Sequence, residues 1–528
     1  MEYSHTRVGW KMSSLMIVAS VGFFYVYSYL TFQAPGIFNS PDESMNALAV
    51  EQLARGFKLG ITIPEYLREY QFIDPRATFL RGPEVVQSGF LGMPLLYGLI
   101  GRAVRQAHAG WYLTPLFAIL GAWGLYFLTK TAFHTRIALF SFFVYLVTPA
   151  VWYYATRGMF HNVLFTVFII WGLYFFMRGA QGTHSGFAHR VCVLLYCAAA
   201  GIILGLGLWV RPSEAVWLIV AIAAVWFVLR RSIKPWHAAV TLVIMGTLGA
   251  LYFVAQRALL GAWLPGGYGV EAAANGQNFL KFLVPFGFHP SAIVFNVYHY
   301  YVRMFWWITL PALCGLALAV GRWKHENHTR KAFFWFTLIT GLGLTVIIYG
   351  NWMTYDNPNP AVVSITNAHV RYWLPLFVLS VPWMVFCLDT LTHWFVRRAH
   401  IVVAVIAGAM IIFFSVLIVW QGQDGLSGVL ASLKQGEHLQ TVLEERAKHD
   451  DLILVDREDK FIFPQFWVSR RWDYDSIHRL LVEGHGVWYV NDNNQKRFIE
   501  EQAELAQYGL RLEEKYFRAP HVVYSVEQ

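Results

Sequence analysis

The sequence predicts a polytopic α-helical membrane protein with a small extracytoplasmic α/β domain at its C-terminal end. The chain has 528 residues, of which 56% are hydrophobic and 14% charged, and its mean hydropathy is +0.43. A soluble domain of this size does not have such a composition. Apolar runs long enough to cross a bilayer recur up to residue 420, and the remainder has an ordinary charged composition. We therefore expect a transmembrane domain over residues 1–420 and a separate domain over residues 421–528.

The apolar runs predict the number and the places of the spans. A span needs about 20 residues, with some shorter or tilted, so we expect about eleven transmembrane helices. They are predicted at Met12–Phe32, Trp111–Thr129, Ile137–Ala155, Met159–Met177, Val191–Val210, Ala215–Leu229, Ala238–Ala255, Phe305–Val320, Ala332–Gly350, Trp373–Leu388 and Ile401–Trp420. The first run follows Arg7 and Lys11 and precedes no small-residue cleavage site, which favours a retained anchor over a signal peptide.

The stretch Phe90–Ala103 is apolar, short and rich in glycine, so it fits either a span or a helix in the membrane interface. With a cytoplasmic N-terminus, the interfacial alternative places every basic cluster on the cytoplasmic side, whereas a spanning helix moves all later clusters outside. We therefore expect an integral protein of the plasma or inner membrane, with interfacial helices in a first external loop at 33–110 and the C-terminal domain outside. These clusters account for most of the net charge of +9, so membrane lipids and not nucleic acid are the expected partners.

Residues 421–528 alternate between short β-like runs and helical stretches. The strands are predicted at Leu452–Val455, Val487–Val490 and His521–Val526, and the helices at His438–Lys448, Ser476–Val482 and Gln495–Tyr508. This mixture predicts a small α/β domain. Asp473-Tyr474-Asp475 matches the metal-binding D-x-D pattern of nucleotide-sugar transferases, but Asp475 stands where the following helix needs an N-cap. The four cysteines all lie in apolar runs, which indicates neither a disulfide framework nor a zinc site.

The first external loop opens with a helix signal. Ser40 is a good N-cap, Pro41 fits the first helical position, and Glu43 stands where a capping box places its carboxylate. Gly56 is expected to end this helix. These local roles leave Asp42 without a specific task beyond favouring the positive end of the helix dipole. We therefore predict that Asp42 is a catalytic base, which the helix holds at the membrane surface.

Three arginines stand in short connections on the predicted external side, against the positive-inside rule. They are Arg157, Arg211 and Arg371. An arginine near lipid needs an anionic partner. Since Asp42 and Glu43 are predicted on the same face, the polar chemistry is expected to converge on the outer surface.

Four features on this face carry a resemblance to a known superfamily. They are Pro41-Asp42-Glu43 with Leu53-Ala54-Arg55-Gly56, then Thr156-Arg157-Gly158-Met159-Phe160-His161-Asn162, then Gly207-Leu208-Trp209-Val210-Arg211-Pro212, and last His369-Val370-Arg371-Tyr372-Trp373-Leu374-Pro375-Leu376. Over the membrane part, the chain resembles the GT-C membrane glycosyltransferases, which include dolichyl-phosphate-mannose protein mannosyltransferases and the aminoarabinose lipid A transferase. It departs from them at His161, where many members carry an acidic residue, and at Arg81-Gly82-Pro83, where some carry a basic-Pro-Pro segment.

An enzyme on the outer face cannot rely on cytoplasmic nucleotide sugars, and the resemblance likewise implies a polyprenyl-phosphate-linked sugar donor with a glycan, lipid or protein acceptor. Asp42 is expected to take the acceptor proton as general base, and Arg371 is the first choice to hold the departing phosphate. A single displacement predicts inversion at the anomeric carbon. The resemblance further suggests Arg211, Arg157 and Arg81 for the phosphate, and His161, His369 and Tyr372 for the substrate pocket.

Several roles stay open at this point. Glu43 could cap the helix, orient Asp42 or share its work, although adjacent side chains on a helix diverge by about 100°. A divalent cation is compatible with the carboxylate pair, but no ligand set in the sequence requires one. Arg211 could simply mark the end of a span, His369 could be a loop histidine, and Tyr372 could belong to an interfacial aromatic belt.

Two other classes of protein compete with the enzyme. A transporter or lipid flippase also has many spans, but it usually places ionisable groups near the bilayer midplane and often shows paired halves. Here the centres of the spans are almost free of charge, and no internal repeat is visible. The third class is a sensor or assembly protein that acts through residues 421–528.

Overall fold

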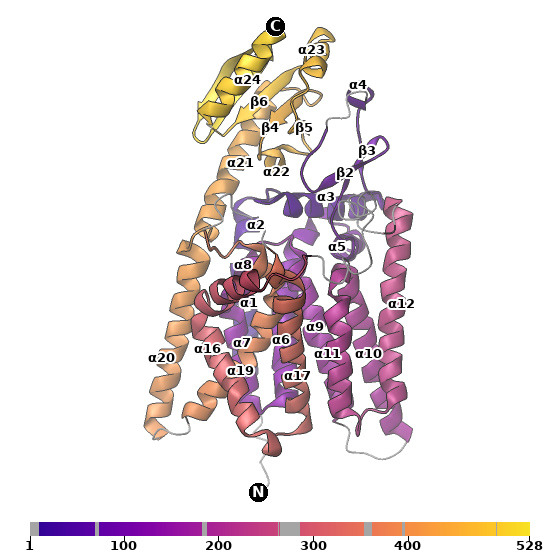
Figure 1. The fold of residues 1–528 in the computed structure, drawn as a ribbon, viewed down its shortest axis with the longest axis vertical. Coiled ribbons are helices and arrows are strands. Elements are labelled where there is room, and N and C mark those ends of the chain that lie inside the picture. The colour runs from indigo at the N-terminus through magenta and orange to yellow at the C-terminus, as the bar shows by residue number, and fades with distance from the viewer. Residues whose placement is uncertain are drawn as a thin grey trace.

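The computed structural model describes residues 10–68, 73–181, 187–261, 263, 286–352, 362–392, 397–492 and 494–528. Helices run side by side in a bundle, and a sheet domain sits on one end of it (Figure 1). The membrane helices and their short extensions are α1 (Trp10–Tyr27), α2 (Tyr29–Gln33), α6 (Leu113–Ala132), α7 (Thr135–Val147), α8 (Pro149–Thr156), α9 (His161–Gly179), α10 (Phe187–Val210), α11 (Ala215–Leu229), α12 (Pro235–Leu260), α15 (Pro290–Asn296), α16 (Trp306–Gly321), α17 (His328–Leu342), α19 (Leu374–Thr392) and α20 (Arg397–Val416).

Within these described ranges, eight helices are long and apolar enough to cross a membrane, or up to ten if each of two bent pairs is one span. The first apolar run forms α1, whose apolar part, Met12–Tyr27, is shorter than these helices, and Arg7 lies outside the described residues. The protein is therefore an integral membrane protein, and the expected count of eleven spans stays a prediction.

The expected span Ile137–Ala155 is broken. It forms α7 and α8, which meet at an angle of 50°. Pro149 opens α8, and Thr148 before it is extended, with φ −62° and ψ 121°. Proline has no backbone N–H to continue a helix and disfavours helical geometry in the preceding residue, which explains the break.

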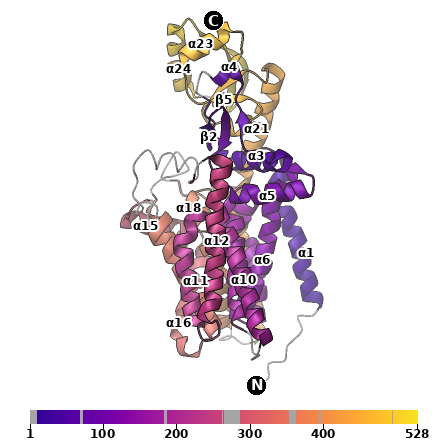
Figure 2. The ribbon, with the colours of Figure 1, turned by 90° about the vertical axis from the view of Figure 1, so that its right-hand side faces the viewer.

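The predicted first external loop contains α3 (Pro41–Gly56), β1 (Ile61–Thr62), α4 (Glu65–Arg68), β2 (Thr78–Arg81), β3 (Glu84–Gln87), α5 (Gly92–Ala103) and η1 (Ala107–Tyr112). Helix α3 lies across the end of the bundle, with α5 beside it (Figures 1 and 2). Gly98 allows this close packing, because a Cβ there would lie 2.6 Å from the Cβ of Leu53. At 1.5 Å per residue, α5 is about 18 Å long, too short to cross about 30 Å of hydrocarbon.

Helix α3 begins as predicted but is capped differently. Ser40 is extended and Pro41 occupies the first turn, yet Ser40 makes no side-chain cap hydrogen bond. The expected capping box is wrong because the carboxylate of Glu43 binds Arg157 instead. The helix also includes Gly56, and Phe57 takes the left-handed conformation with φ 56°. The first turn of α3 is therefore held by other parts of the chain.

The C-terminal domain has a five-stranded sheet in the order β5-β4-β6-β8-β7, with β4 parallel to β5 and β6 and the other pairs antiparallel. Its elements are α21 (Leu426–Arg446), β4 (Leu452–Val455), α22 (Asp459–Ile462), β5 (Trp467–Ser469), α23 (Tyr474–Val482), β6 (Val487–Asn491), α24 (Gln495–Gln507), β7 (Arg511–Arg518) and β8 (His521–Glu527). The three predicted strands are confirmed, and the three predicted helices are present, although α21 begins at Leu426 and not at His438. The elements β5, β7 and α22 were not expected. Asp473, not Asp475, caps α23, because the Asp473 side chain accepts from the backbone N of Ser476.

Candidate functional site

A cavity of about 190 Å³ that is lined by charged and aromatic side chains lies where α3 meets the ends of the membrane helices. Its lining residues come from segments that are far apart in the chain. They include Asp42 and Asn46 from α3, Gln87 to Phe90 from the first loop, Phe160 to Asn162, Arg211 and Ser213, Phe286, Tyr349 and Trp352, and Arg371 and Tyr372. The fold thus brings five of the predicted site residues together: Asp42, His161, Arg211, Arg371 and Tyr372.

Asp42 and Arg371 form an ion pair across this cavity. Nη1 of Arg371 donates to Oδ2 of Asp42 at 3.2 Å. The Asp42 side chain is 48% exposed and that of Arg371 is 12% exposed, so the cavity leaves the carboxylate open to a ligand. Arg371 comes from α18 (Ala368–Tyr372), and its guanidinium lies 4.9 Å from the ring centre of Phe160.

Arg211 enters the cavity with its own counter-ion. Its Nε donates to Oε1 of Glu214 at 2.9 Å, and its Nη2 donates to the hydroxyl of Tyr349 at 2.6 Å. The Tyr349 hydroxyl in turn donates to Oε1 of Glu214, and Nε1 of Trp217 donates to Oε2. This buried network fixes the guanidinium and neutralises it. Glu214 and Tyr349 were not predicted from the sequence, although the i,i+3 spacing of Arg211 and Glu214 was a usable signal.

Aromatic rings form one wall of the cavity. Tyr349 and Tyr372 stack with ring centres 4.5 Å apart, and Trp352 lies 5.5 Å from Tyr372. Phe286 stacks on Trp352 at 5.2 Å, and the Arg211 guanidinium lies 4.6 Å from the ring centre of Tyr372. Tyr372 is therefore part of the cavity wall and of its cationic side. Such flat, apolar faces suit the C–H faces of a sugar or the first part of an isoprenoid chain.

Glu43 and Arg157 form a second, buried ion pair that points away from Asp42. Nε of Arg157 donates to Oε2 of Glu43 at 3.0 Å and to Oε1 at 3.2 Å, and the two side chains are 2% and 4% exposed. Arg157 also donates to the hydroxyl of Tyr153 at 3.0 Å. Together Glu43 and Arg157 line a separate, smaller cavity. The expected divergence of adjacent carboxylates on a helix accounts for this division.

The remaining predicted residues hold neighbouring structure. Arg81 on β2 binds the carboxylate of Glu84 and the backbone oxygen of Leu59, the latter at 2.7 Å. His369 is buried, with Nδ1 2.7 Å from Oδ1 of Asn367 and Nε2 3.1 Å from the carbonyl oxygen of Tyr349. Burial lowers the pKa of His369 to about 4, which keeps its imidazole neutral near pH 7. His369 thus supports Tyr349 from behind the cavity wall.

His161 begins α9, and its ring lies 6.1 Å from that of Phe90 in an edge-to-face contact. Asn46 joins α3 to the segment just before α9, because its Nδ2 donates to the carbonyl oxygen of Met159 at 2.9 Å.

In the part of the chain that the structure describes, no group of three or more His, Cys, Asp or Glu side chains could hold a metal ion. Among the described residues that line the cavity, Asp42 is the one carboxylate.

No family model matches the chain, and no curated protein matches it. Solved structures do match. ArnT from Cupriavidus metallidurans bound to undecaprenyl phosphate is 12% identical, with 97% of each chain covered and a TM-score of 0.56. The Archaeoglobus fulgidus oligosaccharyltransferase tethered with an acceptor peptide is 11% identical, with 92% of this chain and 69% of that chain covered and a TM-score of 0.56. The same archaeal enzyme, AglB, in complex with an inhibitory peptide and a dolichol-phosphate has a TM-score of 0.50 over 93% of this chain and 59% of that chain, at 11% identity. The chain therefore has the fold of the GT-C membrane glycosyltransferases.

Proposed function

We propose that the protein is an integral-membrane glycosyltransferase that moves a sugar from a polyprenyl-phosphate donor to an acceptor on the extracytoplasmic face. The observation that carries this proposal is the cavity in which Asp42 and Arg371 lie 3.2 Å apart beside Arg211. A general base and two arginines around one solvent-connected space are the groups that this transfer needs. The undecaprenyl phosphate bound by ArnT and the dolichol-phosphate bound by AglB support the choice of donor.

The proposed reaction is a single displacement. An acceptor hydroxyl or amine attacks the anomeric carbon while the bond from that carbon to the phosphate oxygen breaks. Asp42 takes the proton of the acceptor, and the electron pair of the broken bond stays on the departing polyprenyl phosphate. The sugar is therefore transferred with inversion at the anomeric carbon.

Arg371 has a second task in this scheme. In the structure it binds Asp42 directly, whereas Arg211 is already paired with Glu214. A donor phosphate is a stronger partner for a guanidinium than a half-exposed carboxylate is, because charge-assisted bidentate contacts favour it. When the donor binds, Arg371 turns from Asp42 to the phosphate, which leaves the Asp42 carboxylate ready to accept the acceptor proton.

The position of the charges favours an enzyme over a transporter. Asp42, Arg211 and Arg371 line one cavity, and the helices α3 and α18 that carry Asp42 and Arg371 lie toward the same end of the bundle (Figure 2). A transporter would need its ionisable groups near the middle of the spans.

The decisive experiment compares Asp42→Asn with the parent protein on lipid-linked sugars extracted from expressing membranes. Asp42→Asn should lose transfer while its gel-filtration profile in detergent stays that of the parent. Asp475→Asn in the C-terminal domain is the matched control and should keep full activity. A parent protein that consumes no lipid-linked sugar, or an Asp42→Asn variant with the parental rate, would refute the proposal.

A further inference from the structure

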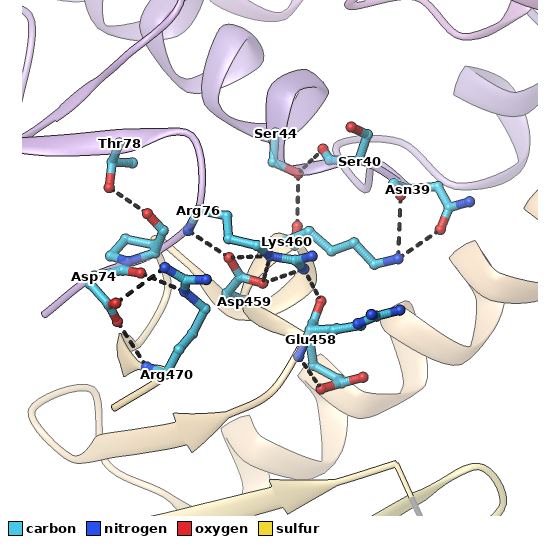
Figure 3. Close-up of polar contacts among 12 residues, drawn as sticks. Asn39, Ser40, Ser44, Asp74, Arg76, Thr78, Glu458, Asp459, Lys460 and Arg470 are labelled. Atoms are coloured by element: carbon cyan, nitrogen blue, oxygen red, sulfur yellow. Dashed lines mark hydrogen bonds and ion pairs between the residues drawn. The ribbon is translucent and has the colours of Figure 1, made fainter. Parts of the chain in front are cut away.

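The four-residue helix α22 of the C-terminal domain contacts two separate segments of the first external loop. One segment is the start of α3, which carries Asp42, and the other is the turn before β2 (Figure 3). Both segments contribute to the wall of the cavity, through Asp42 and Ala77. One short helix therefore touches the rim of the proposed active site at two places.

Asp459 holds the turn before β2. Its Oδ2 accepts from the backbone N of Arg76 at 2.7 Å, and its Oδ1 accepts from Nε of Arg76 at 2.9 Å. The Asp459 side chain is only 1% exposed. Ala77, the residue after Arg76, has φ 59°, a conformation that residues with a side chain seldom adopt without support from their surroundings. The carbonyl oxygen of Ala77 accepts from the backbone N of Ser88, another cavity residue, at 2.9 Å.

Lys460 holds the start of α3. Its carbonyl oxygen accepts from Oγ of Ser44 at 2.8 Å, and its Nζ donates to Oδ1 of Asn39 at 3.0 Å. Asn39 also accepts from Oγ of Ser432 on α21 at 2.9 Å. Asn39 and Ser44 stand on either side of Asp42, and the N-cap of this helix makes no side-chain hydrogen bond of its own. The C-terminal domain thus holds the start of α3 through side chains on either side of Asp42.

We propose that α22 positions the catalytic cavity, so that sugar transfer requires the C-terminal domain to be docked and Asp459 acts as a positioning residue. This inference rests on the proposed function of Asp42. Asp459 does not touch the cavity itself. It fixes Arg76, and through Arg76 the left-handed turn at Ala77, while Lys460 next to it fixes the residues around Asp42. Loosening α22 therefore shifts the base relative to the opposite wall.

The test uses the full-length protein and the variant Asp459→Asn, which keeps the shape of the side chain and removes its charge. We expect kcat to fall by about 10- to 100-fold, since a displacement of about 1 Å can cost about 100-fold, with the KM for the donor changed less than about 3-fold. Hydrogen exchange of residues 39–46 and 74–88, measured without substrate, should become faster. Glu527→Gln is the control, because Glu527 pairs with Arg511 and Lys515 at the opposite edge of the sheet.

A reversed pair, Arg76→Asp with Asp459→Arg, should recover part of the lost kcat. If Asp459→Asn does not fold, Arg76→Lys serves instead, because lysine keeps the charge but cannot make the bidentate contact. Parental kcat and parental exchange in Asp459→Asn, or in Arg76→Lys where that variant replaces it, would overturn the inference, as would a fall in kcat without faster exchange.

The two proposals fail in different ways. If Asp42→Asn keeps the parental rate of transfer, the proposed function is wrong whatever the exchange of Asp459→Asn shows. If Asp42→Asn is inactive while Asp459→Asn matches the parent in kcat and in exchange, only the positioning role of α22 is overturned.

Discussion

Substituting the two adjacent acids of α3 should lower the stability of the protein to very different extents. Glu43 is 2% exposed and binds Arg157, which is 4% exposed, whereas Asp42 is 48% exposed and makes one contact of 3.2 Å with Arg371. Removing one partner of a buried ion pair costs about 3–5 kcal/mol, because the other charge is left without a partner in a medium of low dielectric constant. An exposed pair contributes about 0–1 kcal/mol.

We therefore expect Glu43→Ala to lower the free energy of unfolding by about 3–5 kcal/mol. Asp42→Ala should lower it by less than about 1 kcal/mol and yet lose transfer. The assay is SDS-driven unfolding in mixed micelles, followed by tryptophan fluorescence. The double variant Glu43→Ala with Arg157→Ala completes a cycle that isolates the interaction of the pair.

Either of two results would refute the assignment of a structural role to Glu43 and a catalytic role to Asp42. In the first, Glu43→Ala and Asp42→Ala are equally stable, so the burial difference between the two acids has no energetic effect. In the second, the double variant loses as much stability as Glu43→Ala and the single variant Arg157→Ala lose in sum. Glu43 and Arg157 then do not interact. Both results would remove the division of labour between Glu43 and Asp42.

Three more predictions concern the arginines of the cavity and the C-terminal domain. Arg371→Ala should lower kcat by about 100- to 1000-fold, as the loss of one donor to a developing anion does, and Arg371→Lys should recover part of it in a donor-concentration series. Glu214→Gln should loosen the guanidinium of Arg211 and raise the KM for the donor by about 10-fold, since a charge-assisted hydrogen bond contributes about 1.5–3 kcal/mol. The same donor-concentration series measures this KM. Burial, followed by Arg76 and Arg157, lowers the pKa of Lys460 from 10.5 to about 8, against the opposing pull of Glu458 and Asp459. Between these two pH values the unfolded chain binds more protons than the folded one, so stability should rise with pH by up to about 1.4 kcal/mol per unit. Thermal melts across that window should show this extra slope in the parent and not in Lys460→Met.

The arginines show what sequence reasoning could reach. Because Arg157, Arg211 and Arg371 break the charge rule for connections that are predicted to be external, each was expected to need an anionic partner, and each has one. The identities of these partners were not predictable in the same way. Glu214 is local, at i,i+3 from Arg211, but the partner of Arg157 lies 114 residues away and that of Arg371 lies 329 residues away.

Contacts with distant residues also explain where the predictions from the sequence were wrong. The capping box at Ser40 and Glu43 was a sound local expectation, but Arg157 is a stronger partner for the Glu43 carboxylate than a backbone N–H is. His369 looked like a loop histidine or a pocket residue, and its burial behind Tyr349 depends on packing that no local pattern encodes. The strands β5 and β7 were missed because β5 has only three residues and β7 is rich in charge.

The contact of α22 with both loop segments has a consequence for protein engineering. A chimera that joins this membrane bundle to a foreign C-terminal domain would lack Asp459 and Lys460, although its spans would be intact. Such a chimera should insert into the membrane and yet be inactive. Activity should return when both side chains, and the backbone carbonyl of Lys460 that accepts from Ser44, are grafted back at the junction. If the proposed role of α22 holds, the smallest transplantable catalytic unit of this protein extends beyond its membrane helices and includes a single helical turn from the far end of the chain.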